Sequence, residues 1–260
     1  MSETLEAKCP VAFPLERDAV PEPAADYRRL RADEPIIKVT LPTQQEAWLV
    51  TRHADVRAIL IDPRISADRS HPNFPLRQPV QKVLRKGFSA LAKSLLALDL
   101  PEHTAPRQML ANEFTLRKIN TLRPVIQKIV DDRIDAMLAA GPPADLVADL
   151  ATQVPSRMIC ELLGVPQDTR EFFQDRTLTL QLPSSTPEQR FEAADDLGKF
   201  LDELVTEKER EPTDDVLGRL IVRNRGTGVY THELLVGMAQ NLLIGGHETT
   251  INAIALGTIG

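Results

Sequence analysis

The helical pattern after Pro101 most constrains how this chain can fold. Apolar residues recur there at the i, i+3 and i+4 spacing of amphipathic helices, with few strand signals between them. Gly164, Pro166 and Pro183 mark the ends of segments, and Thr231 is a suitable N-cap for the last one. The predicted helices span residues 102–113, 115–140, 151–163, 167–180, 187–211, 213–224 and 231–260.

The N-terminal part carries a different pattern. Residues 1–23 are rich in proline and polar residues, and we interpret them as an extended tail. Two short runs rich in β-formers within 36–51 are separated by a turn segment, which predicts a β-hairpin. The fold class expected is mainly α with a small β region, in a single domain over residues 1–260 that is helical over 101–260. The predicted N-terminal elements are a helix over 27–32, strands over 36–41 and 47–51, and a helix over 55–61.

Composition argues against several classes of function. A net charge of −6 and a pI near 5.5 speak against nucleic-acid binding, which needs a basic surface. Cys9 and Cys160 lie far apart and match neither a disulfide framework nor a zinc motif, which favours a reduced, cytoplasmic setting. The acidic N-terminus predicts no signal peptide or membrane anchor. The apolar stretch over 233–260 contains several polar residues and is predicted to be a buried helix rather than a membrane span.

One motif interrupts that last helix: Gly245-Gly246-His247-Glu248-Thr249-Thr250. Each glycine inside a helix costs about 1 kcal/mol relative to alanine, so a pair needs a packing or functional reason. Glycines permit a kink or a close approach to a flat group, and a threonine hydroxyl can bond back into the helix. Glu248 beside Thr249 is interpreted as a buried acid next to a hydroxyl, a possible proton relay. The alternative is an ordinary glycine pair at a helix crossing.

A second motif is Asp99-Leu-Pro-Glu-His-Thr-Ala-Pro-Arg107. On a helix that begins near Pro101, His103 and Arg107 lie four residues apart on one face. Two such donors suit a carboxylate or a phosphate. The alternative is an exposed first turn in which Glu102 favours the helix N-terminus.

Together these segments resemble a bacterial, soluble, actinobacterial-type cytochrome P450, a haem-thiolate monooxygenase, from about Phe13 to Gly260. The segment Phe-Pro-Leu-Glu-Arg with the following Tyr-Arg-Arg-Leu-Arg resembles the family's first helix. Glu-Ala-Trp-Leu-Val-Thr-Arg-His-Ala-Asp-Val resembles its first sheet and second helix. Leu-Pro-Glu-His-Thr and Gly-Gly-His-Glu-Thr-Thr resemble its third helix and the oxygen-activating motif of its central helix.

The resemblance implies roles for these residues. Gly245 and Gly246 would flank a groove over the haem where dioxygen binds. Thr249 and Glu248 would act in oxygen activation and proton delivery, and His103 with Arg107 would hold the haem propionates. It also implies an apolar substrate and electrons from a ferredoxin-type partner. By this resemblance, the region that lines the pocket in the family contains Leu84, Phe88, Leu91, Leu95 and Leu98, and its lid contains Leu178, Leu180 and Leu182.

The chain departs from the family's pattern in one important respect. The family's cysteine iron ligand lies in a Phe-x-x-Gly-x-x-x-Cys loop, which this sequence lacks, and neither Cys9 nor Cys160 has that context. A thiolate ligand favours O–O cleavage. We therefore expect the chain to be the N-terminal part of such an enzyme, ending within the central helix and inactive alone. The alternatives are a nitric-oxide-reducing haem enzyme and a non-catalytic truncated helical remnant.

Overall fold

The structure, a computed structural model, describes residues 11–17, 22–68, 71, 74, 95–182 and 184–259. The chain divides into two compact units, Met1–Gln81 and Lys82–Gly260, each with its own cluster of buried apolar residues. The arrangement of a single domain over residues 1–260 stays a prediction.

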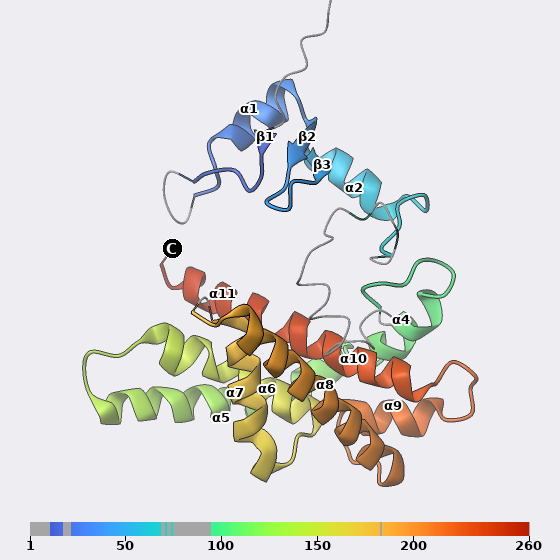
Figure 1. Ribbon diagram of the computed structural model, residues 1–260. Helices are drawn as coiled ribbons and strands as arrows, with labels where there is room; N and C mark the ends of the chain where they lie inside the picture. Colours follow the sequence, from blue (N-terminus) through green and yellow to red (C-terminus); the bar gives the residue numbers. More distant parts are fainter. Residues whose placement is uncertain are drawn as a thin grey trace, which may run out of the picture. The chain divides into compact units, whose positions relative to one another are not determined.

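The described residues of the first unit form a three-stranded sheet and two helices (Figure 1). Strand β2 (Ile36–Thr40) pairs antiparallel with β3 (Glu46–Val50), which confirms the predicted hairpin. Helices α1 (Asp26–Asp33) and α2 (His53–Ile61) confirm the two helices predicted on either side of it. Leu15, Ala24 and Leu30 form a buried apolar cluster in this unit, and Val39 and Leu41 are buried as well.

A third strand was not expected from the sequence. Strand β1 (Val11–Ala12) pairs in parallel with β2, with Val11 opposite Val39 and Ala12 opposite Thr40. The interpretation as a tail is therefore wrong for these two residues. Two residues are too few to show the alternation of a strand, so no local signal announces this pairing.

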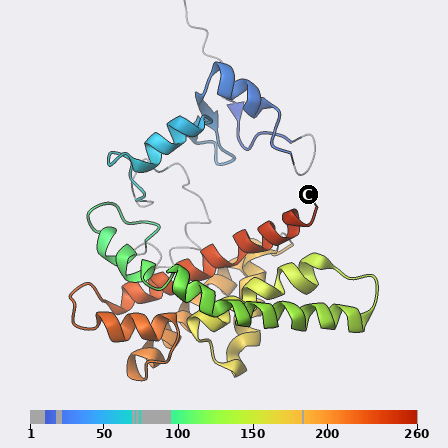
Figure 2. The ribbon, with the colours of Figure 1, turned by 180° about the vertical axis from the view of Figure 1, so that it is seen from behind.

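The second unit is helical, as predicted. Helix α10 (His232–Gly246) packs against both α6 (Gln153–Leu163) and α8 (Pro187–Arg210), and these contacts form the centre of the unit's apolar core (Figures 1 and 2). Two short elements with other helical geometries precede α6 and α7. The elements among the described residues of this unit are α4 (Thr104–Ala111), α5 (Leu116–Ala140), the π-helix η2 (Val147–Ala151), α6 (Gln153–Leu163), the 3-10 helix η3 (Gln167–Thr169), α7 (Arg170–Gln181), α8 (Pro187–Arg210), α9 (Val216–Asn224), α10 (His232–Gly246) and α11 (Glu248–Gly257).

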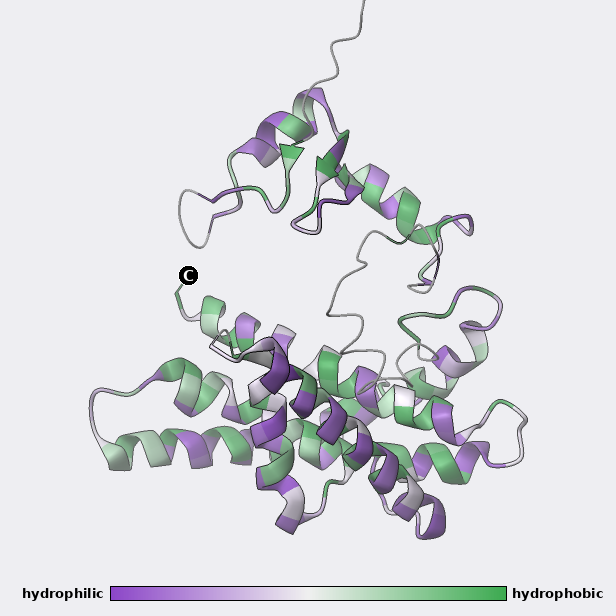
Figure 3. Cartoon of the chain, viewed as in Figure 1, coloured by the Kyte–Doolittle hydropathy of each residue, from purple (hydrophilic) through white to green (hydrophobic). Residues whose placement is uncertain are grey.

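Hydropathy explains how the long helices are oriented. The visible face of α8 is largely hydrophilic, whereas its buried face carries Leu197, Leu201 and Leu204 (Figure 3). Such a two-sided helix packs one stripe on the core and leaves the other in water. Across the described residues, no helix combines the length and apolarity that crossing a membrane requires.

Thr231 caps α10, as its sequence position predicted. The Thr231 hydroxyl accepts a hydrogen bond from the Leu234 amide at 3.1 Å. We expect Thr231→Ala to lower the free energy of unfolding by about 1 kcal/mol, because that amide loses its partner. Urea unfolding of the chain followed by circular dichroism would measure this. The control Thr121→Ala, at an exposed position inside α5, should change stability by less; equal losses would contradict the capping role.

Candidate functional site

The central helix is broken within the Gly-Gly-His-Glu-Thr-Thr motif. Helix α10 ends at Gly246 and α11 begins at Glu248, while His247 between them has φ −98° and ψ −79°. The Thr249 hydroxyl donates to the Gly245 carbonyl oxygen at 2.7 Å. The kink permitted by the glycine pair is thus present, and the threonine bonds back into the helix as expected.

The two glycines have different surroundings. A methyl group at Gly246 would collide with the side chain of Ile159 on α6, so Gly246 lets the two helices approach closely. A methyl group at Gly245 would meet no described atom within 4 Å. Gly246 therefore has a packing reason, and Gly245 is the residue that faces open space.

The acid and the hydroxyl lie on the open side of the break. Glu248 and Thr249 are exposed, whereas His247 is 0% exposed. The expectation of a buried acid at Glu248 is therefore wrong for the described structure. The physical reason is the rotation of the helix: successive residues point about 100° apart, and His247 occupies the side facing α6.

His103 and Arg107 lie one helical turn apart, as predicted. Helix α4 begins at Thr104 with His103 as its N-cap, and the Arg107 amide donates to the His103 carbonyl at 3.1 Å. His103 is half-buried and Arg107 is exposed. Among the described residues, neither side chain makes a hydrogen bond or an ion pair. No such interaction therefore joins them to the described helix break at His247. Both donors are thus available to an external acceptor.

The apolar residues expected to line a substrate site lie in different environments. Phe88 and Leu91 lie outside the described residues. Leu95 and Leu178 are half-buried. Leu180 packs against the apolar core of the second unit, which gives it a structural role there.

His247 is a site residue that the motif interpretation underrated. Its Nε2 lies 2.5 Å from Ser156 Oγ on α6, and burial lowers the pKa of the imidazole to about 4. The sequence did hold a signal: His247 continues the row of buried residues Val236, Ala239 and Leu243 at helical spacing. Its partner, 91 positions away, has no such signal.

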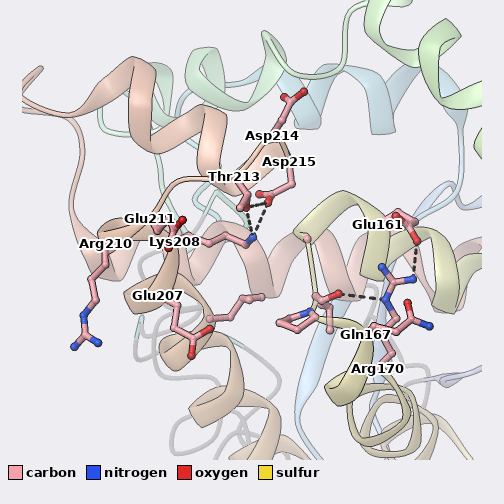
Figure 4. Close-up of a pocket in the computed structure, with 14 residues that line it drawn as sticks. Glu161, Gln167, Arg170, Glu207, Lys208, Arg210, Glu211, Thr213, Asp214 and Asp215 are labelled. Carbon is pink, nitrogen blue, oxygen red and sulfur yellow. Dashed lines mark hydrogen bonds and ion pairs between the residues drawn. The ribbon is translucent and has the colours of Figure 1, made fainter.

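The polar hollow in Figure 4 is in another place. It has a volume of about 700 Å³ and is lined by parts of α6, α8 and the segment before α9. None of the predicted site residues lines it. Lys208 in its wall binds Thr213 Oγ1 at 2.7 Å and Asp215 Oδ2 at 2.5 Å, and Glu161 binds Arg170 at 2.6 Å. These charges satisfy one another, which is typical of a structural network.

Comparison with known proteins decides the family resemblance. No family model matches the chain. It is 43% identical over 248 residues to cytochrome P450-SOY of Streptomyces griseus, covering 95% of this chain and 59% of that protein. Vitamin D3 dihydroxylase of Streptomyces griseolus is 39% identical, and the match covers 95% of this chain and 60% of that protein. The crystal structure of cytochrome P450 MoxA from Nonomuraea recticatena is similar with a TM-score of 0.82 and 42% identity, over 96% of this chain and 62% of that chain. This chain has a partial cytochrome P450 fold.

The P450 comparison confirms the resemblance and the fold class inferred from the sequence. The chain spans about three fifths of the length of the P450s it matches, 59% and 60% of the two relatives and 62% of the solved chain. The match extends over 95% of this chain, so it includes residues of both units.

A P450 fold implies haem, and the residues present fit one face of such a flat group. Gly245 leaves open space, and Glu248 and Thr249 are exposed beside it. Within the described part of the chain, Cys160 is fully buried, and burial raises the pKa of its thiol to about 11, which disfavours the thiolate form. No group of three or more potential metal-binding side chains occurs in the described part of the chain.

Proposed function

We propose that this chain is the oxygen-activating part of a haem-dependent monooxygenase. The whole enzyme would hydroxylate an apolar small molecule, using O2 and electrons from a redox partner of the ferredoxin type. Support comes from the named activity of relatives such as vitamin D3 dihydroxylase, and from the P450 fold. The half-buried Leu95 and Leu178, together with Phe88 and Leu91, are proposed as substrate contacts.

One observation carries this proposal: the open glycine with an exposed acid and a hydroxyl next to it. Haem, when bound, supplies the binding and reduction of dioxygen. Gly245 gives the group room, and the Thr249 hydroxyl, held at 2.7 Å from the Gly245 carbonyl, is oriented at the edge of that space. Glu248 is one residue away and is exposed to solvent. His103 and Arg107 are proposed to bind the haem carboxylates, since two cationic or neutral donors on one turn suit a carboxylate.

The first experiment determines the intact mass of the native protein and its haem content. A mass well above 28.9 kDa, with bound haem whose reduced carbon-monoxide spectrum indicates thiolate ligation, is expected. A native protein of 28.9 kDa that binds no haem would overturn the proposal and favour a non-catalytic helical protein. The variants His103→Ala and Arg107→Ala should each retain less haem after gel filtration.

Thr249→Ala should uncouple the enzyme. Oxidation of NAD(P)H should continue, but hydroxylated product per NAD(P)H should fall by about tenfold or more and peroxide should rise, because proton delivery loses its hydroxyl. The matched control is Thr250→Ala, whose hydroxyl is exposed and makes no described hydrogen bond. Full coupling in Thr249→Ala would remove this residue from proton delivery.

A further inference from the structure

Two irregular helix segments meet at His247 and Thr152. We propose that the hydrogen-bonded chain from His247 through Ser156 to the Thr152 carbonyl is a positioning device that fixes the break in the central helix. It thereby holds the Gly245 carbonyl and the Thr249 hydroxyl in place. We call this hydrogen-bonded series of His247, Ser156 and Thr152 the lock. Only its consequence for oxygen chemistry rests on the proposed function; the hydrogen bonds themselves do not.

The direction of the hydrogen bonds follows from proton counting. The Ser156 hydroxyl donates to the Thr152 carbonyl oxygen at 2.7 Å. A serine hydroxyl has one proton, so toward His247 it can only accept. The imidazole must therefore carry a proton on Nε2, which lies 2.5 Å from Ser156 Oγ. The burial that lowers the pKa of His247 to about 4 keeps the ring neutral, so the hydrogen bond to Ser156 Oγ decides which of the two neutral tautomers is present.

The Thr152 carbonyl, which accepts the last hydrogen bond of this series, belongs to a second irregular helix segment. Thr152 lies between η2 and α6, and its amide donates to the Val147 carbonyl, five residues back, at 2.9 Å. The Ser156 amide reaches the Thr152 carbonyl only at 3.4 Å, so the Ser156 hydroxyl is the closer donor. π-type turns inside helices occur frequently at functional sites.

The lock lies where the central helix changes its packing partner. Helix α10, before the break, packs on α6 and α8, whereas α11, after the break, packs on η2. Ile159, three residues after Ser156 on the same face of α6, lies against Gly246. Glycines permit a break but do not specify its direction. The contacts of His247 and Gly246 with one face of α6 supply that direction.

The test uses the folded protein and four variants. In the wild type, nitrogen-15 NMR of the His247 ring should show the Nε2–H tautomer from pH 6 to 8. Ser156→Ala and His247→Leu should each speed hydrogen exchange at the amides of residues 249–251 by about tenfold, the size of one buried hydrogen bond. His247→Gln, whose amide can donate to Ser156, should restore most of the protection.

A control separates the lock from general stability. Thr177 is 2% exposed, and its hydroxyl makes the same kind of bond, to the Phe173 carbonyl at 2.7 Å, but has no histidine partner. Thr177→Ala should leave the exchange of residues 249–251 unchanged relative to the rest of the core. An Nδ1–H tautomer, or equal exchange in Ser156→Ala and Thr177→Ala, would overturn the proposal.

The link to chemistry is measured separately. In the haem-loaded enzyme, Ser156→Ala should lower product per NAD(P)H, and His247→Gln should keep most of it. Unchanged coupling in Ser156→Ala, with the NMR and exchange results as expected, would overturn only the link to Thr249. Absence of haem from the native protein would overturn the proposed function and leave the lock intact.

Discussion

Gly164→Ala is expected to lower the free energy of unfolding by about 3 kcal/mol or more. Gly164 ends α6 with φ +64°, a conformation that costs an L-residue about 1–2 kcal/mol. The added methyl carbon would also lie 2.6 Å from Lys208 Nζ and collide with the Asp215 carboxylate. That carboxylate caps α9 through the Gly218 amide at 2.9 Å, so the collision would disturb a buried ion pair and a helix start together.

A matched glycine isolates the collision. Gly226, shortly after α9, has φ +85°, and a methyl group there would meet no described atom within 4 Å. Gly226→Ala should therefore cost only the strain of a positive φ, about 1–2 kcal/mol. Urea unfolding of both variants measures the difference. Equal losses of stability would show that the contact with Lys208 and Asp215 contributes nothing.

Glu113→Gln is expected to cost about 3 kcal/mol, the size typical of breaking a buried ion pair. The Glu113 side chain is 0% exposed and binds Lys118, Arg219 and Arg223 at 2.7, 2.8 and 2.8 Å. These contacts connect the segment after α4 to α5 and α9. A neutral amide at position 113 would leave the positive charges of Lys118, Arg219 and Arg223 without the negative charge that compensates them. Asp132→Asn, which breaks an exposed pair with Lys128, should cost less than about 1 kcal/mol.

The Glu113 cluster also predicts how stability depends on pH. Burial by itself would raise the pKa of Glu113, but hydrogen bonds from Lys118 and Arg219 outweigh it and lower the pKa. The folded protein therefore stabilises the ionised form of Glu113 relative to the unfolded chain. This stabilisation is complete above the ordinary value of 4.5 and is lost as the pH falls through the lowered pKa. The stability difference between wild type and Glu113→Gln should shrink below pH 4.5; a constant difference would contradict the ion-pair account.

Much of the local structure could be predicted from the sequence. Four features depend on residues within a few positions of one another. They are the helix periodicity, the Thr231 cap, the hairpin and the break in the helix after Gly245-Gly246. Backbone preferences and side-chain spacing act over that range, so a single sequence expresses them directly. The motif residues of the candidate site rest on the same short-range spacing, and their roles stay predictions.

Contacts between distant residues were decided only by the tertiary structure. The pairing of Val11–Ala12 with β2, the fit of Gly246 against Ile159, and the bond between His247 and Ser156 each join segments far apart in the chain. Which of two adjacent glycines faces open space, and whether Glu248 is buried or exposed, depends on how α10 is rotated against α6. That rotation results from packing of whole helix faces, to which many residues contribute small terms, and no short segment encodes it.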